Sequence, residues 1–280
     1  MVAWQPTSTG SDMPSAVRRV AVVGGHGKTG RAVTAALEAR GVVTDPIGRR
    51  ELADLPRALA PADGLYVIAP NMHADEPVFV RRVLKVARSV GVWRVAYHSV
   101  AAPYVPAMPH HVGKAEAENA VRMGPLDWTI LQPCAYVQNF VPALQSEDPK
   151  LRIAYSPTTS FGLVDLADVG AAAAEVLLSE VHLGATYELG GPSLVSVDDV
   201  AATAQKVLGR EIRVQPVTVD EWRATDAVGL DPRVSDWLAA MFAYYDDYGL
   251  PTGPVPLRSL LGREPTSLEA TLARELTHPR

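Results

Sequence analysis

The sequence predicts an α/β fold of the Rossmann type, a doubly wound parallel sheet with a smaller C-terminal α/β substrate lobe. Three observations predict it. Short apolar runs end at Gly or Pro, apolar residues recur at helical spacing between these runs, and a glycine-rich turn follows the first run. Strands that alternate with helices need crossover connections, which produce a parallel sheet.

The first half of the chain accounts for most of the predicted sheet. We expect strands at 19–23, 42–48, 65–69, 92–97 and 128–131, and helices at 29–40, 78–90 and 112–123. Only residues 51–64 separate the second strand from the third, which is too short for another strand and its crossover helix. The strand that usually follows the second one in this fold is therefore expected to be missing or vestigial, which leaves the strand at 42–48 at the edge of the sheet. Pro46 agrees with this, because proline inside a strand is tolerated mainly at a sheet edge.

The second half predicts fewer strands and more helices. Asp165 is expected to cap a helix at 166–178, and a strand should follow at 186–189. Ser196 and Asp199 resemble a capping box that opens a helix to Leu208, where Gly209 ends it. A last strand is expected at 212–217, before a helical, aromatic C-terminal segment. We expect a tail at 1–16, a dinucleotide-binding domain at 17–150 and, at 151–280, mainly the substrate lobe, interleaved with the last Rossmann elements.

Composition restricts the function. The 280 residues are 48% hydrophobic and 20% charged, a soluble globular balance. A net charge of -5 argues against nucleic acid as a partner, because phosphate contacts need clustered Lys and Arg. No apolar run approaches the roughly 20 residues that span a bilayer, and residues 1–16 lack signal-peptide features. The single cysteine, Cys134, excludes an intrachain disulfide and fits a reducing, cytoplasmic location.

The segment from Gly24 to Gly30 has the features of a phosphate loop. Gly24 is expected to make the tight turn, Gly27 to let the backbone approach a pyrophosphate, and Gly30 to let helix and strand pack closely. The helix N-terminus then offers amide groups to the phosphates. The loop therefore predicts NAD(P) binding, with a purely structural turn as the alternative. Its other predicted contacts are His26, which is equally well explained as an exposed turn residue, and Lys28 and Thr29.

The end of the second strand bears on the choice between NADP and NAD. Arg49 and Arg50 follow that strand directly, and a guanidinium group suits the 2′-phosphate of NADP. Asp45 is the competing candidate for the ribose of NAD, but it falls within the strand. We therefore favour NADP(H) over NAD(H); the alternative is that both arginines line a solvated edge. The carboxyl ends of the other strands add Ala69, Pro70 and Pro133 to the predicted cofactor site.

Residues 97–140 carry the most specific motif, YHSVAAPYVPAMPHHVGKAEAENAVRMGPLDWTILQPCAYVQNF. This stretch resembles the NmrA-like family of atypical short-chain dehydrogenase/reductases, in which a strand ending in Ser precedes a helix with a Lys and a TILRP strand. The matching positions are Ser99, Lys114 and 129–133, with Gln132 in place of the family's Arg, followed by Asn139. The resemblance continues through VDLADVGAAAAEVL, YELGGPSLVSVDDVA and LLGREPTSLE. It implies a Rossmann fold and an NAD(P)-dependent reductase or a dinucleotide-binding regulator.

The resemblance also defines the catalytic question. Typical short-chain dehydrogenases use Ser, Tyr and Lys, with Tyr one helical turn before Lys. Here that position is His110. Either His110 replaces Tyr as the general acid because imidazole titrates near neutrality, or Tyr104 or Tyr136 reaches the site, or no proton donor exists. Lys114 is expected to bind the nicotinamide ribose and Ser99 to polarise the acceptor oxygen. The alternative for Lys114 is a surface lysine paired with Glu118.

The remaining candidates lead to two functional hypotheses. His98, His110 and His111 lack ligands at suitable spacing, so no metal site is expected. Cys134 is interpreted as a small buried side chain. The aromatic residues of the lobe suggest an apolar or aromatic small-molecule substrate, or simply its core. The leading hypothesis is an NADP-dependent oxidoreductase acting on a carbonyl, enone or quinone. The alternative is a non-catalytic, NADP(H)-responsive regulator with a protein partner.

Overall fold

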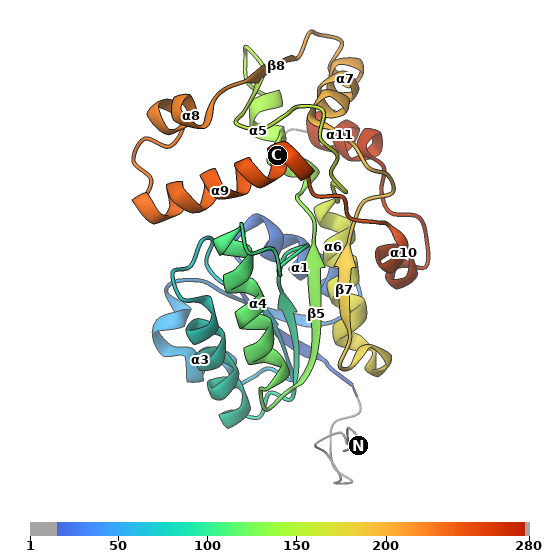
Figure 1. Cartoon of the computed structure of the whole chain (residues 1–280). Helices are drawn as coiled ribbons and strands as arrows, with labels where there is room; N and C mark the ends of the chain where they lie inside the picture. Colours follow the sequence, from blue (N-terminus) through green and yellow to red (C-terminus); the bar gives the residue numbers. More distant parts are fainter. Residues whose placement is uncertain (1–15, 278–280) are drawn as a thin grey trace, which may run out of the picture. The chain divides into compact units, whose positions relative to one another are not determined.

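The computed structural model describes residues 16–277, so the predicted tail at 1–16 lies outside the described residues except for Ala16. The elements are shown in Figure 1. Their order along the chain is β1 (Arg19–Val23), α1 (Lys28–Glu38), β2 (Val43–Ile47), η1 (Glu51–Asp54), α2 (Leu55–Leu59), β3 (Gly64–Val67), α3 (Glu76–Ser89), β4 (Arg94–His98), α4 (Pro109–Arg122), β5 (Asp127–Pro133), η2 (Val137–Asn139), α5 (Val141–Leu144), β6 (Lys150–Ile153), α6 (Leu166–Leu178), η3 (Glu180–His182), β7 (Thr186–Leu189), α7 (Val197–Leu208), β8 (Arg213–Pro216), α8 (Val219–Thr225), α9 (Pro232–Tyr248), α10 (Val255–Leu261) and α11 (Leu268–Thr277).

The main sheet has six strands in the order β2-β1-β3-β4-β5-β7. The pairs β1–β2, β1–β3, β3–β4 and β4–β5 are parallel, as predicted. β2 lies at the edge, and the connection from β2 to β3 contains only η1 and α2. The predicted loss of the usual third strand is therefore confirmed. The strand order reverses between β1 and β3, which is where an open α/β sheet forms its ligand crevice.

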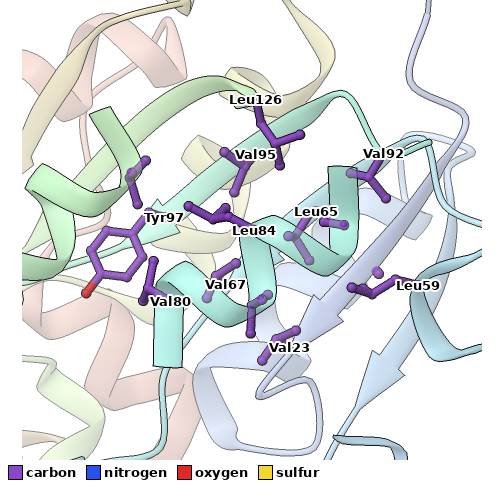
Figure 2. Close-up of a cluster of buried hydrophobic side chains, with 14 of the residues drawn as sticks. Val23, Leu59, Leu65, Val67, Val80, Leu84, Val92, Val95, Tyr97 and Leu126 are labelled. Carbon is purple, nitrogen blue, oxygen red and sulfur yellow. The ribbon is translucent and has the colours of Figure 1, made fainter. Parts of the chain in front are cut away.

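Successive side chains of each strand point to opposite faces of the sheet, and both faces are buried. Ala21 and Val23 of β1 belong to one buried cluster with β3, β4 and the helices α2 and α3, whereas Val20 and Val22 are buried away from it. Figure 2 shows Val80 and Leu84 of α3 among side chains of the strands. α6 packs against α1, since a Cβ at Gly170 would lie 2.5 Å from the Ala32 carbonyl oxygen.

The chain divides into two compact units and crosses between them five times. The units therefore interleave along the sequence, and the expectation of a lobe mainly after residue 150, interleaved with the last Rossmann elements, stays a prediction. The first unit consists of the chain up to Ser99, Glu116–Leu131 and Gly170–Thr186, and the second of Val100–Ala115, Gln132–Val169 and Tyr187–Arg280.

The second unit contains a small parallel sheet of β6 and β8 and its own apolar cluster. The predicted capping box is present, with Ser196 and Asp199 satisfying each other's backbone N–H groups and Gly209 ending α7 at φ 65°. The strand β6 was missed by sequence reasoning. α4 begins at Pro109 rather than at 112, so His110 and His111 lie in its first turn. Along residues 16–277, no helix combines the length and apolar character needed to cross a membrane.

Candidate functional site

The phosphate loop connects β1 to α1 in the first unit. Gly24 has φ +79°, the Gly25 N–H donates to the Val22 carbonyl at 2.9 Å, and the Gly27 N–H donates to Gly24 at 3.0 Å. A Cβ at Gly30 would lie 2.5 Å from the Gly25 Cα, and one at Gly25 would lie 2.7 Å from the Pro46 Cα. The turn and the close packing predicted for Gly24 and Gly30 are therefore present. The packing role of Gly25 was missed, because it depends on the neighbouring strand.

Gly27 differs from the other glycines of the loop. Its φ of -73° suits any residue, and a Cβ there would meet only the Gly24 carbonyl oxygen, at 3.3 Å. The protein's own packing therefore places little demand on a glycine at this position. Gly27 is also the N-cap of α1, which has no side-chain cap and no acidic residue in its first turn. A backbone without side chain at an uncapped helix N-terminus fits the pyrophosphate of a dinucleotide.

Lys28 and Thr29 begin α1 directly after this N-cap. Partial loss of water around the Lys28 ammonium lowers its pKa from the usual value. A cation here adds to the positive end of the helix dipole, so the first turn of α1 carries basic rather than acidic character. Phosphate contacts of Lys28 and Thr29 stay a prediction.

The carboxyl end of β2 lies beside this loop. The His26 ring packs against Gly48, where a Cβ would lie 2.5 Å from the ring Cδ2. Its Nε2 is 3.7 Å from a Glu51 carboxylate oxygen, which accepts the Gly48 N–H at 2.8 Å. That hydrogen bond lowers the pKa of Glu51. Gly48 and Glu51 were missed by sequence reasoning, because their importance appears only when the loop and the strand end are brought together.

The two candidates for the adenosine ribose differ in their surroundings. Arg49 and Arg50 are exposed directly after β2. Asp45 lies within β2 and accepts two hydrogen bonds from the Arg19 guanidinium, at 2.6 and 2.7 Å. The Asp45 carboxylate is therefore already bound within the sheet, whereas the two arginines face solvent.

The other residues of the first unit that were predicted for the cofactor and catalytic site follow β3 and β4. Ile68 touches the loop, since a Cβ at Gly24 would lie 2.9 Å from its carbonyl oxygen. Ala69 is buried and Pro70 exposed. Ser99 is buried and donates its hydroxyl proton to Glu118 at 2.5 Å. A hydroxyl has one proton, so polarising an acceptor oxygen, the role expected of Ser99, would require this bond to break.

Glu118 is the centre of a short buried network that sequence reasoning missed. Its carboxylate is fully buried, and its second oxygen accepts from Arg122 at 3.0 Å. Arg122 also donates to the Thr186 hydroxyl at 2.9 Å. Burial of a carboxylate is tolerated when such partners satisfy it. The network ties the end of β4 to α4.

In the second unit, His110 is buried beside the aromatic ring of Trp237, with ring centroids 6.0 Å apart. Burial and the nearby cations of Lys114 and Arg233, together with His111, lower the pKa of His110 to about 3. The premise that this imidazole titrates near neutrality is therefore wrong. At neutral pH His110 is uncharged, which makes it a weak proton donor.

His111 lies deeper in the second unit. It is fully buried, its Nδ1 is 3.3 Å from the Ala102 carbonyl oxygen, and its Nε2 is 3.5 Å from the Tyr245 hydroxyl. Burial lowers the pKa of His111 to about 4. Ala102 has φ 51°, a strained conformation for a residue with a Cβ, and its N–H donates to Glu188.

Lys114 is only 7% exposed. The alternative of a surface lysine is therefore wrong.

Pro133, at the end of β5, is also buried. Cys134 is buried as predicted, where its Sγ contacts the Leu250 carbonyl oxygen at 3.4 Å and burial raises its pKa to about 11.

The other tyrosines considered as proton donors have different surroundings. Tyr104 is 64% exposed, and Tyr136 is half-buried. His98 is bound to the Tyr66 hydroxyl at 2.7 Å. Within residues 16–277, no group of three or more His, Cys, Asp or Glu side chains is placed to hold a metal ion.

Four aromatic residues of the second unit pack together. Tyr155, Phe161, Phe242 and Tyr245 pack on one another with ring centroids 5.3–5.8 Å apart and belong to its apolar cluster. These side chains form lobe core, as the simpler interpretation held. Trp237 lies beside His110 and is half-buried, as Tyr155 and Phe242 are.

The chain is similar to a protein family and to several known reductases. The model of the NmrA-like family matches residues 50–277. NAD(P)H azoreductase of Xenophilus azovorans is 27% identical over 212 residues, which are 74% of this chain and 73% of that protein. Quinone oxidoreductase 2 of Escherichia coli strain K12 is 26% identical over 87% of this chain and 84% of its own. The structure of the Escherichia coli NADPH-dependent quinone oxidoreductase with NADPH has a TM-score of 0.75 at 23% identity, covering 91% of this chain and 99% of that one.

Proposed function

Since the chain belongs to the NmrA-like family, we propose that it is an NADP(H)-dependent reductase that transfers a hydride to a carbonyl, enone or quinone-like small molecule. One observation carries the proposal: the Gly27 backbone has space for a ligand at an uncapped helix N-terminus, beside the basic end of β2. The names of two relatives, an NAD(P)H azoreductase and a quinone oxidoreductase, support the same chemistry.

The first unit would hold the dinucleotide, which supplies the hydride when bound. The backbone at Gly27 and the first turn of α1 would bind the pyrophosphate, and Arg49 and Arg50 the 2′-phosphate. The Asp45 carboxylate is paired with Arg19 and so is not available to a ribose hydroxyl, which favours the 2′-phosphate of NADP.

We expect Arg49→Ala to weaken NADPH binding about tenfold, the scale of one charge-assisted hydrogen bond, and to leave NADH binding unchanged. Calorimetric titration with both cofactors measures this, and unchanged NADPH affinity would contradict the assignment.

The missing tyrosine favours quinone-like acceptors over simple ketones. A hydride added to a ketone leaves a strongly basic alkoxide, which needs a general acid in the transition state. A hydride added to a quinone leaves an aromatic hydroquinone anion whose charge is delocalised, and water can protonate it afterwards. The second case needs no general acid, so it is compatible with a neutral His110, whose pKa burial lowers to about 3. Lys114 is proposed to bind the nicotinamide ribose, and its cation would also stabilise the product anion.

Turnover tests the proposal. We expect NADPH oxidation with 1,4-naphthoquinones and little with aliphatic aldehydes. Lys114→Ala should lower kcat/KM for the quinone with folding retained, and Lys206→Ala, an exposed lysine on α7, serves as its control. NADPH binding without turnover on quinones, enones or aldehydes would contradict the enzymatic proposal.

A second candidate function is a non-catalytic, NADP(H)-responsive regulator. The histidine in the tyrosine position and its low pKa favour it. A regulator must bind oxidised and reduced cofactor with different affinities, because a ligand shifts conformations only through differential binding. Equal affinity for NADP⁺ and NADPH would exclude this candidate, whatever the turnover.

A further inference from the structure

The carboxyl end of β2 carries an acidic residue beside the two arginines proposed to bind the 2′-phosphate. Glu51 follows Arg49 and Arg50 directly in the sequence. Its side chain is 36% exposed and both arginines are exposed, so a ligand at this strand end can reach all three. In a dinucleotide-binding fold an acidic residue here accepts a hydrogen bond from the ribose 2′-hydroxyl of NAD, whereas arginine accommodates the 2′-phosphate of NADP. This strand end contains both kinds of residue.

Contacts with the phosphate loop hold Glu51 on the loop side of β2. Its Oε2 accepts the Gly48 N–H at 2.8 Å and lies 3.7 Å from Nε2 of His26, the third residue of the loop. The loop is tied to the same strand end, because the Gly24 N–H donates to the Ile47 carbonyl oxygen at 2.9 Å. The two oxygens of a carboxylate offer about four lone-pair positions. Glu51 can therefore accept a further hydrogen bond while it keeps the one from Gly48.

The Glu51 carboxylate also interacts with the cations of this region. Hydrogen bonds from backbone N–H groups, first that of Gly48, lower the pKa of Glu51, and the charges of His26 and Arg50 lower it further. The carboxylate is therefore ionised at neutral pH and offsets part of the Arg50 charge. A 2′-phosphate at Arg50 is repelled by this carboxylate, whereas an uncharged 2′-hydroxyl is not.

We propose that Glu51 equips this site for NADH as well as NADPH: its carboxylate accepts a hydrogen bond from the adenosine 2′-hydroxyl of NADH, and its charge opposes the 2′-phosphate of NADPH. The inference rests on the proposed cofactor site, in which Arg49 and Arg50 bind that phosphate. The reaction is the same with either cofactor: a hydride leaves the nicotinamide ring, which is oxidised, and the acceptor takes up that hydride and one proton from water. Only the affinity at the adenosine ribose differs.

Calorimetric titration of the full chain with NADPH and with NADH tests the inference, because the two cofactors differ only in the 2′-phosphate. Glu51→Gln removes the charge and keeps an oxygen that can accept the Gly48 N–H. We expect this variant to bind NADPH about threefold to tenfold more tightly, the scale of one pair of charges near solvent. Its affinity for NADH should fall severalfold, because a neutral amide is a weaker hydrogen-bond acceptor than a carboxylate.

Two comparisons separate this effect from a structural one. Asp54→Asn is the matched control, since Asp54 is an exposed carboxylate of the same short helix η1 and also accepts a backbone N–H, that of Arg57 at 3.4 Å. It should leave the ratio of the two affinities unchanged. The gain in NADPH affinity of Glu51→Gln should shrink at about 1 M KCl, where exposed charges are screened within about 3 Å. A disturbed loop would instead weaken the binding of both cofactors at any salt concentration.

The outcomes separate the inference from the proposed function. An unchanged affinity ratio in Glu51→Gln, or an equal change in Asp54→Asn, would overturn the inference. Tighter NADPH binding with unaltered NADH binding would overturn the hydroxyl contact, and with it the use of NADH. Wild-type protein that binds NADPH but not NADH would overturn the inference and leave the proposed reductase intact. Binding of neither cofactor would overturn both.

Discussion

At the residue scale, each glycine of the phosphate loop is required for a different structural reason. The spacing of Gly24, Gly27 and Gly30 is visible in the sequence, because each position has a known role in a strand–turn–helix phosphate loop. Gly25 and Gly48 were not predictable. Gly25 is required by Pro46 of the neighbouring strand, and Gly48 by the ring of His26. Such requirements arise between segments that are distant in sequence, and spacing does not report them.

Gly27 and Gly30 should respond differently to alanine. At Gly30 a Cβ would overlap the Gly24 carbonyl oxygen and lie 2.5 Å from the Gly25 Cα. We expect Gly30→Ala to lower the free energy of unfolding by about 1–3 kcal/mol, the usual cost of overpacking. Gly27→Ala should keep the stability but weaken NADPH binding, because the added methyl group occupies the ligand's space. Urea denaturation and calorimetry measure the two effects; a stable Gly27→Ala that binds NADPH normally would contradict the assignment of this space.

The buried histidines predict how stability depends on pH. The folded-state pKa values of His110 and His111 are lowered to about 3 and about 4, below the unfolded value of about 6.5. As pH falls below about 6.5, the unfolded chain binds protons that the folded chain does not bind. Stability should therefore fall with decreasing pH, by up to about 1.4 kcal/mol per pH unit for each histidine. Urea denaturation between pH 7 and pH 5 measures the slope. A His110→Gln/His111→Gln double variant with the wild-type slope would show that these groups are not its source.

At the element scale, β1, β7, α6 and α7 match their predicted bounds. Asp165 precedes α6, and Ser196 and Gly209 are the caps of α7. The 17-residue helix α9 received no bounds from the sequence, which predicted only a helical, aromatic segment there. The other misses are short and depend on tertiary contacts. β6 has four residues and is a strand only because β8 pairs with it. α2 is a single turn of helix in a connection that sequence reasoning treated as too short for a full crossover.

Two glycines inside helices provide a test of helix packing. A Cβ at Gly170 of α6 would lie 2.5 Å from the Ala32 carbonyl oxygen of α1, whereas one at Gly113 of α4 would meet no atom within 4 Å. We expect Gly170→Ala to destabilise the protein by about 1–3 kcal/mol through overpacking. Gly113→Ala should stabilise it by about 0.5–1 kcal/mol, because alanine restricts the unfolded chain. Thermal unfolding of both variants decides the matter, and a stable Gly170→Ala would contradict the close crossing of α1 and α6.

At the scale of the whole molecule, the fold class and the family followed from the sequence. The sequence also led us to expect a lobe mainly after residue 150, interleaved with the last Rossmann elements, but the exact segments of each unit depend on tertiary contacts. These contacts place Gly170–Thr186 in the first unit. This segment supplies the Leu177 and Ser179 carbonyls that accept from buried Arg94, and the Ala185 carbonyl that accepts the Ile130 N–H.

A fragment covering residues 17–150 should therefore fail to fold. Without Gly170–Thr186, the Arg94 guanidinium and the β5 backbone would lose these acceptors, and buried polar groups without partners are costly. We expect the fragment to lack a cooperative unfolding transition by circular dichroism, whereas the full chain shows one. A cooperatively folded fragment that binds NADPH would show that the dinucleotide-binding part is contiguous after all.

The most direct test of the central claim combines two readings on one sample of the full chain: calorimetric titration with NADPH, and NADPH oxidation in the presence of a naphthoquinone. The account predicts NADPH binding that Gly27→Ala weakens, and quinone-dependent oxidation above the protein-free rate that Lys114→Ala reduces. Absence of NADPH binding would contradict the assignment of the phosphate loop, and with it the proposed function.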